Sequence, residues 1–435
     1  MLKILKSEFT KNVAALITGT TIAQLISILL TPIIARLYTP EEFGFYGFYL
    51  SLVGVLTVIA SGRYHLALFI VKHRSKAVYI LKSTILVTFF MAIVISLMLL
   101  LFRFFYGYFS PWFYILGVIV LNAALIEVFS IYANTKGQYK LMSANMIIRS
   151  IVANLIFILL GFLQYGRVGL MLGIILGQFS QLFHFYMYIK SDIQINKLNY
   201  KVFKATLFTY KNFLIHSTSS ALLNNLSIQL PTFFLKKYYN TASVGQYFQS
   251  YKLLTLPNSF IAKSFGSVFA QKVADSLKQK LPIDKMVISL YQKLIFVSVI
   301  PFSLLAIYGD KIMVFVLGEQ WQLAGSFAQI ISPWIYINFI VLPFTYLFEI
   351  YQKQKHFSIF NLVLLVTRFI ALIIGYLYKD VYLSVMLFSI TSFFIYGAML
   401  FYLFRLTKVK GFINYIMYVV LFISGVLIVS LFRLW

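Results

Sequence analysis

Two cations lie deep inside apolar stretches of this sequence. Lys252 is eight residues into its apolar run and Arg368 is eleven residues into another, which on a helix places them about 12 and 16 Å from the nearer end. A charge at the centre of a membrane helix costs roughly 2.5 to 3.5 kcal/mol. The acidic residues within such runs are only Glu127 and Glu349. Cations without nearby carboxylates indicate a hydrated cavity that accepts an anionic ligand.

These charges also have simpler interpretations. Lys252 or Arg368 could bond a carbonyl at a helix end, or pair with Glu127, with no ligand involved. Arg63 lies at an intermediate depth, and Arg36 is close to the end of its run, where a long cationic side chain anchors a helix at the interface. We predict that all four cations are candidate ligands of an anionic substrate.

A polar stripe that occurs twice is the second candidate feature. Residues spaced by three or four share one face of a helix, and two such sets are Thr20, Gln24, Ser27 and Thr31, then His216, Ser220, Asn224 and Ser227. One interpretation is a substrate-binding cleft lined by Thr20, Gln24, Ser220 and Asn224. The other is helix packing, because such polar side chains commonly join membrane helices.

The elements that must position these residues are apolar helices. Of 435 residues, 61% are hydrophobic and 11% are charged, whereas an average soluble domain has about 25% charged residues. An ordinary soluble protein is therefore excluded. A bilayer core needs about 20 apolar residues per helix, and we find thirteen such runs: 13–36, 44–70, 79–102, 112–133, 147–163, 169–189, 213–235, 244–269, 287–308, 327–350, 357–378, 381–404 and 412–432.

The basic residues predict the orientation of the chain. Of the 37 Lys and Arg residues, 25 fall in alternate connecting segments that include the N-terminus, 8 fall in the opposite set and 4 fall inside runs. This bias places the N-terminus in the cytoplasm. The charges are spread along the chain instead of forming a basic domain, so they predict contact with anionic lipid of the bilayer and no nucleic-acid partner.

Cofactor chemistry has no support in the sequence. The chain has no Cys, its five His residues show no metal-ligand spacing, and no Gly-rich phosphate loop is present. We predict no metal site, no cofactor and no catalytic residue.

An internal repeat with an offset near 200 residues predicts the domain organisation. Residues 9–12 (FTKN) match 208–212 (FTYKN), and Ser27-Ile28 matches Ser227-Ile228. We predict a six-helix bundle over 1–190, a cytoplasmic linker over 191–212, a second six-helix bundle over 213–404, and a loop with an additional hydrophobic helix over 405–435. Both bundles start in the cytoplasm. A pseudo-two-fold axis along the membrane normal would relate them, as in transporters that alternate access between their halves.

Several segments resemble the O-antigen flippases, the Wzx-type polysaccharide transporters of the multidrug/oligosaccharidyl-lipid/polysaccharide (MOP) exporter superfamily. They are 17–24 (ITGTTIAQ), 32–33 with 36–44 (PI and RLYTPEEFG), 62–64 (GRY), 244–247 (VGQY), 318–321 (GEQW) and 324–325 (AG). The resemblance covers the twelve-helix core and implies a MATE-like MOP fold, all-α and polytopic. His65 departs from the family pattern, because relatives often carry an acidic residue at this position. A salt bridge formed by that acidic residue would lack its carboxylate in this sequence.

The family implies a function without enzymatic chemistry. Its members move an undecaprenyl-pyrophosphate-linked oligosaccharide from the cytoplasmic to the periplasmic leaflet of the bacterial inner membrane, and the polysaccharide polymerase machinery is a candidate partner. Basic side chains would attract the pyrophosphate. A cation-coupled multidrug antiporter of the same superfamily is the alternative, but it needs acidic residues at depth. A membrane polymerase or ligase needs a larger outside loop than this sequence offers.

Overall fold

The computed structural model describes residues 8–71, 73–106, 111–194, 199–258 and 262–409. These residues form helices joined by short connections, with no strand among them. Ten of the helices are long and apolar enough to cross a membrane, judged by length and composition. The prediction of an all-α, multi-pass membrane protein is confirmed.

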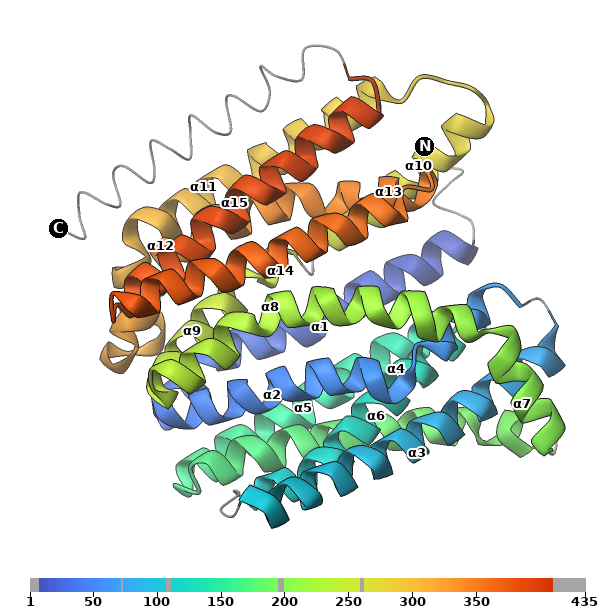
Figure 1. Cartoon of the computed structure of the whole chain (residues 1–435), viewed down its shortest axis with the longest axis horizontal. Helices are drawn as coiled ribbons and strands as arrows, with labels where there is room; N and C mark the ends of the chain where they lie inside the picture. The colour runs from blue at the N-terminus through green and yellow to red at the C-terminus, as the bar shows by residue number, and fades with distance from the viewer. Residues whose placement is uncertain (1–7, 72, 107–110, 195–198, 259–261, 410–435) are drawn as a thin grey trace. The chain divides into compact units, whose positions relative to one another are not determined.

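The chain divides into two compact units. The first takes its described residues from Met1–Tyr38 and Phe48–Asn225. In it α1 packs on α5, α5 on α6, and α3 and α6 each on α4 (Figure 1). Its helices are α1 (Glu8–Leu37), most of α2 (Pro40–Ser61), the 3-10 helix η2 (Tyr64–Phe69), α3 (Arg74–Tyr106), α4 (Trp112–Thr135), α5 (Tyr139–Phe162), α6 (Arg167–Gln194), α7 (Tyr200–Thr209), the π-helical turn η3 (Phe213–Ser217) and the start of α8 (Thr218–Tyr238).

The second unit takes its described residues from Thr39–Gly47 and Leu226–Trp435. In it α11 packs on α12, α12 on α15, and α14 on α15. It contains the rest of α8, then α9 (Thr241–Leu254), α10 (Lys263–Lys278), α11 (Asp284–Leu317), η5 (Glu319–Trp321), α12 (Gln322–Val341), η6 (Leu342–Thr345), α13 (Tyr346–Ile350), α14 (Gln354–Leu377) and α15 (Val381–Leu406).

Three packing contacts recur in both units. The contacts α3–α4, α4–α6 and α5–α6 of the first unit correspond to α11–α12, α12–α15 and α14–α15 of the second. This agreement supports the internal repeat. The domain boundaries at 190 and 212 and the axis between the bundles stay predictions.

The eighth predicted run differs from the structure. Residues 244–269 were expected as one helix, but α9 ends at Leu254 and α10 begins at Lys263. Pro257 lies between them and has no backbone N–H to donate to the preceding turn. The predicted helix at 412–432 lies outside the described residues.

Two glycines allow a close backbone contact in the second unit. A Cβ on Gly44 of α2 would lie 1.8 Å from the Thr241 carbonyl oxygen, and a Cβ on Gly245 of α9 would lie 1.8 Å from the Pro40 carbonyl oxygen. Small residues let membrane helices approach to this distance. The start of α2 therefore packs directly on the start of α9.

A charged cluster joins three parts of the first unit. Asp192 on α6 is only 4% exposed. Its carboxylate accepts hydrogen bonds from Arg74 Nη2 of α3 at 2.8 Å and from Lys136 Nζ, which follows α4. Two cations thus stabilise one buried carboxylate.

Replacing Asp192 with Asn is expected to lower the stability of the first unit by about 1–3 kcal/mol, because two charge-assisted hydrogen bonds lose their anionic acceptor. Thermal unfolding of the purified protein in detergent measures the change. The exposed Glu319 has no side-chain partner in the described part of the chain, so Glu319→Gln is the control. Equal unfolding temperatures for the two variants would contradict the assigned role of the cluster.

Candidate substrate-binding site

Arg368 is the centre of a polar and aromatic group inside the second unit. Its side chain projects from α14 and is 1% exposed. Nε donates to Ser392 Oγ of α15 at 2.8 Å, and Nη1 donates to Ser227 of α8, to Oγ at 2.8 Å and to the carbonyl oxygen at 3.2 Å. Three helices are joined by one guanidinium.

Aromatic rings enclose the same guanidinium. Its carbon lies 4.7 Å from the ring centroid of Phe388, 5.1 Å from that of Trp334 and 5.8 Å from that of Tyr396. The faces of such rings attract a cation. Phe388 and Tyr396 flank Ser392 at intervals of four residues on α15, so one helix face supplies two rings and a hydroxyl. We name this group of Arg368 with its two serines and three rings the arginine cage.

The arginine cage contains no counter-ion. In the part of the chain that the structure describes, no carboxylate lies within 4 Å of Arg368, and Nη2 has no hydrogen-bond partner. The carbonyl that Arg368 bonds belongs to Ser227 in the interior of α8, whereas the simpler interpretation expected a carbonyl at a helix end. Aromatic rings enclose the Arg368 side chain. That it lines a hydrated cavity stays a prediction.

Lys252 lies on α9 beside the aromatic stack that leads to the cage. Its neighbour Tyr251 stacks on Trp334 at 6.0 Å and on Tyr247 at 6.1 Å between ring centroids. The Lys252 side chain is half-buried. Within the described ranges its ammonium group makes no hydrogen bond and no ion pair, which leaves this cation available for an anion.

A backbone break presents Arg63 in the first unit. Helix α2 ends at Ser61, and Gly62 and Arg63 then adopt left-handed backbone angles with φ of 51° and 52°. This conformation is unfavourable for a residue with a Cβ and often occurs at functional positions. Arg63 Nε is buried, and no described group accepts a hydrogen bond from it.

His65 and Glu127 form a pair next to this break. His65 is fully buried, and its Nε2 lies 3.3 Å from Glu127 Oε1 on α4, while the Glu127 side chain is 39% exposed. The carboxylate that the sequence lacks after Arg63-Tyr64 is therefore supplied by another helix. Glu127 therefore has His65 as a partner within the first unit, and its pairing with Lys252 or Arg368 stays a prediction.

The polar stripe of α1 packs against α5. Ser27 Oγ lies 3.0 Å from Ser150 Oγ and accepts a hydrogen bond from Asn154 Nδ2 at 3.2 Å. The Thr20 hydroxyl donates to Met146 Sδ at 3.3 Å. These contacts support helix packing for Ser27 and Thr20.

The remaining predicted residues are more accessible. Gln24 on α1 and Ser220 and Asn224 on α8 are half-buried, and Arg36 is exposed in the last turn of α1. Of the stripe on α8, Ser227 is the member that the structure brings to Arg368. Contact of a substrate with Gln24, Ser220, Asn224 and Arg36 stays a prediction.

Sequence reasoning missed the aromatic part of the cage. Trp334 comes from α12, while Phe388 and Tyr396 come from α15. The available signal was the spacing of four residues along 388–396 and between Tyr247 and Tyr251, which places rings on one helix face. Which cation those rings enclose depends on helix packing and cannot be derived from spacing.

Solved transporters share this fold. The lipid II flippase MurJ in an inward closed conformation has 15% sequence identity over 95% of this chain and 97% of its own, with a TM-score of 0.66. A multidrug resistance MATE family transporter in an outward-facing conformation has 14% identity, with coverage of 94% and 98% and a TM-score of 0.64. A MOP superfamily transporter from Pyrococcus furiosus has 14% identity, with coverage of 93% and 97% and a TM-score of 0.63. The chain has the MOP fold.

The family follows from the sequence match. Residues 33–325 match the family model described as polysaccharide biosynthesis protein. The chain belongs to this family, and the resemblance seen in its sequence motifs is confirmed. No curated protein matches the chain. The matched range includes Arg36, Arg63 and Lys252, whereas Arg368 lies beyond it.

Proposed function

We propose that this protein is a flippase that moves an undecaprenyl-pyrophosphate-linked oligosaccharide, an O-antigen or related repeat unit, from the cytoplasmic to the periplasmic leaflet of the bacterial inner membrane. The observation that carries the proposal is cationic charge in the helical bundle without matching carboxylates, at Lys252 and Arg368. Such charge favours an anionic passenger. Membership of the polysaccharide biosynthesis family supports a glycan as the other part of this passenger.

The cations have different roles in this proposal. Lys252 is half-buried and has no partner among the described residues, so it binds the pyrophosphate directly. Arg368 is fixed by Ser227 and Ser392 behind aromatic rings and supplies a constant positive potential. Arg63 provides a cation in the first unit, where the left-handed break holds it.

The remaining residues and the membrane potential complete the mechanism. Gln24, Asn224 and Ser220 offer hydrogen bonds to sugar hydroxyls, and Arg36 meets the phosphate at a helix end. Alternating access moves the head group while the lipid tail stays in the bilayer. With the cytoplasm negative, outward movement of an anion gains about 2.3 kcal/mol per charge for every 100 mV.

The test is translocation of purified lipid-linked oligosaccharide in vesicles containing this protein. Lys252→Gln is expected to lower the rate about ten- to hundredfold, because a hydrogen bond to a charged group contributes about 1.5–3 kcal/mol. Lys293 on α11 also lies in an apolar run, but it is exposed, so Lys293→Gln is the matched control and should retain the parent rate.

Two outcomes would reject the proposal. The first is no translocation of the lipid-linked oligosaccharide above that of protein-free vesicles. The second is transport of cationic drugs in place of the glycan, which would assign the chain to the antiporters. A Lys252→Gln variant as active as its control would remove this residue from the site and leave the flippase assignment standing.

A further inference from the structure

An apolar groove lies between α3, α4 and α6 of the first unit. It encloses a volume of about 670 Å³. Leu86 and Phe89 of α3 form one wall, Phe183 and Tyr186 of α6 form the other, and α4 forms the floor. The walls are apolar and aromatic, as in sites for hydrophobic ligands.

The groove opens away from the core of the unit. Phe183 is 65% exposed, and Leu86, Phe89 and Tyr186 are exposed as well. Both α3 and α6 are long and apolar enough to cross a membrane. Helix α3 packs mainly on α4, and α6 packs on α5 and α4, while α3 and α6 contact each other little. The space between them therefore faces lipid chains.

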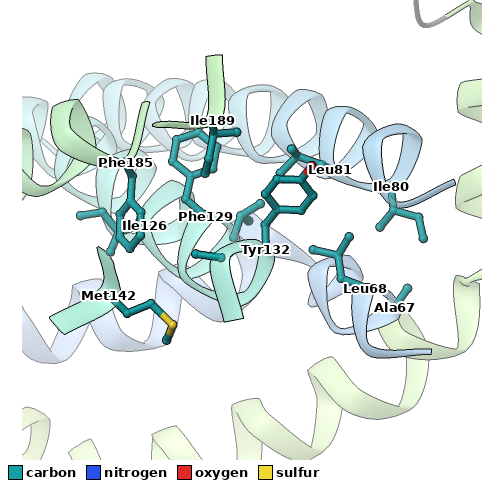
Figure 2. Close-up of a cluster of buried hydrophobic side chains, with 12 residues drawn as sticks. Ala67, Leu68, Ile80, Leu81, Ile126, Phe129, Tyr132, Met142, Phe185 and Ile189 are labelled. Atoms are coloured by element: carbon teal, nitrogen blue, oxygen red, sulfur yellow. The ribbon is translucent and has the colours of Figure 1, made fainter. Parts of the chain in front are cut away.

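A packed cluster separates this groove from Arg63 within the first unit. Phe129 and Ile126 of α4, Phe185 of α6 and Leu68 of η2 belong to one buried group (Figure 2). On α4, Phe129 lines the groove, while Glu127 contacts His65 of η2. A head group near Arg63 and a chain in the groove would lie on opposite sides of this cluster. The groove is therefore distinct from the surroundings of Arg63.

Positive charge marks one end of the groove. Lys82 of α3 is the charged residue among the described lining residues. Ile193 also lines the groove and follows Asp192, whose carboxylate is shared by Arg74 and Lys136. Three cations against one acid leave this end positive, and Arg74 is largely exposed. The distribution of basic residues places it on the cytoplasmic side, where anionic lipids gather.

We propose that the groove binds an anionic phospholipid of the cytoplasmic leaflet, with an acyl chain between α3 and α6 and the phosphate beside Lys82. The chain covers the exposed aromatic side chains and fills the space that the two helices leave between them. Lys82 and the cluster around Asp192 select the negative head group over a zwitterionic one. This site does not depend on which passenger the protein moves.

The experiment measures tryptophan quenching by brominated lipid. The full-length Phe183→Trp variant is reconstituted in phosphatidylcholine vesicles that contain increasing amounts of brominated phosphatidylglycerol or brominated phosphatidylcholine. Phe296→Trp on α11, at a position 83% exposed and outside the groove, is the control. The signal of the four native Trp residues is subtracted by measuring the parent protein.

The expected result is a preference of about fivefold for phosphatidylglycerol at position 183, as for one lysine near an anionic lipid, and none at position 296. Adding Lys82→Gln to Phe183→Trp should remove the preference, while Lys82→Arg should retain it. Equal quenching by both lipids at position 183, or the same preference at position 296, would show ordinary boundary lipid and overturn the proposal. Displacement of the phosphatidylglycerol by an equal amount of polyprenyl phosphate would overturn it in favour of a carrier-tail site.

Discussion

Replacing Arg368 with lysine is expected to lower translocation of the lipid-linked oligosaccharide at least about a hundredfold, although the positive charge is kept. The guanidinium donates to Ser227 and Ser392 at the same time and lies against three rings. An ammonium group is a compact point charge and cannot reproduce this planar arrangement. Unsatisfied buried polar groups cost about 1–3 kcal/mol each, and about 2.8 kcal/mol corresponds to a hundredfold change.

The measurement is the translocation rate per folded protein in vesicles, together with the unfolding temperature in detergent. Arg405→Lys is the control, because Arg405 is exposed in the last turn of α15. A transport rate that falls at an unchanged unfolding temperature supports a role in transport. Rates and unfolding temperatures that fall together would assign Arg368 to packing of α8, α14 and α15. Parent-like transport by Arg368→Lys would show that the positive charge is sufficient without the bonds to Ser227 and Ser392.

Introducing valine at Gly44 or Gly245 is expected to lower the stability of the second unit by about 3 kcal/mol or more, above the usual cost of overpacking. The atoms that a Cβ would meet at 1.8 Å are backbone carbonyl oxygens. A flexible side chain could move aside, but the backbone of a helix start cannot do so without separating α2 from α9. Thermal unfolding and the yield of folded protein measure the loss.

Gly397 on α15 provides the matched comparison for these two variants. A Cβ at that position would meet nothing within 4 Å, so Gly397→Val should unfold close to the parent temperature, apart from differences in helix propensity of less than about 1 kcal/mol. If Gly44→Val and Gly397→Val are equally stable, α2 and α9 do not need the close backbone contact.

Much of the fold could be predicted because the bilayer imposes a simple rule on sequence. A helix that crosses apolar lipid needs a long apolar run, so most of the runs within the described residues correspond to helices. The same rule failed at 244–269. Pro32 and Pro231 remain inside α1 and α8, whereas Pro257 lies between two helices. Proline composition alone does not distinguish a tolerated residue from a break, because neighbouring groups decide it.

The site was predictable only in part. Arg368 could be singled out because a charge in an apolar run is costly wherever it is found. Its rings could not be assigned, since Trp334 belongs to a different helix and its position follows from packing. The pairing of His65 with Glu127 joins η2 to α4, and no spacing rule connects residues so far apart in the chain.

The repeat has one electrical consequence. Ser27 and Ser227 occupy matching positions of the predicted repeat. Ser27 forms hydrogen bonds with the neutral side chains of Ser150 and Asn154, whereas Ser227 accepts a hydrogen bond from the Arg368 guanidinium. The second half therefore holds a fixed charge where the first holds a dipole. If α14 moves along the membrane normal during a cycle, that charge does work in the transmembrane field, up to about 2.3 kcal/mol per 100 mV. Voltage would then act on the carrier itself as well as on its cargo.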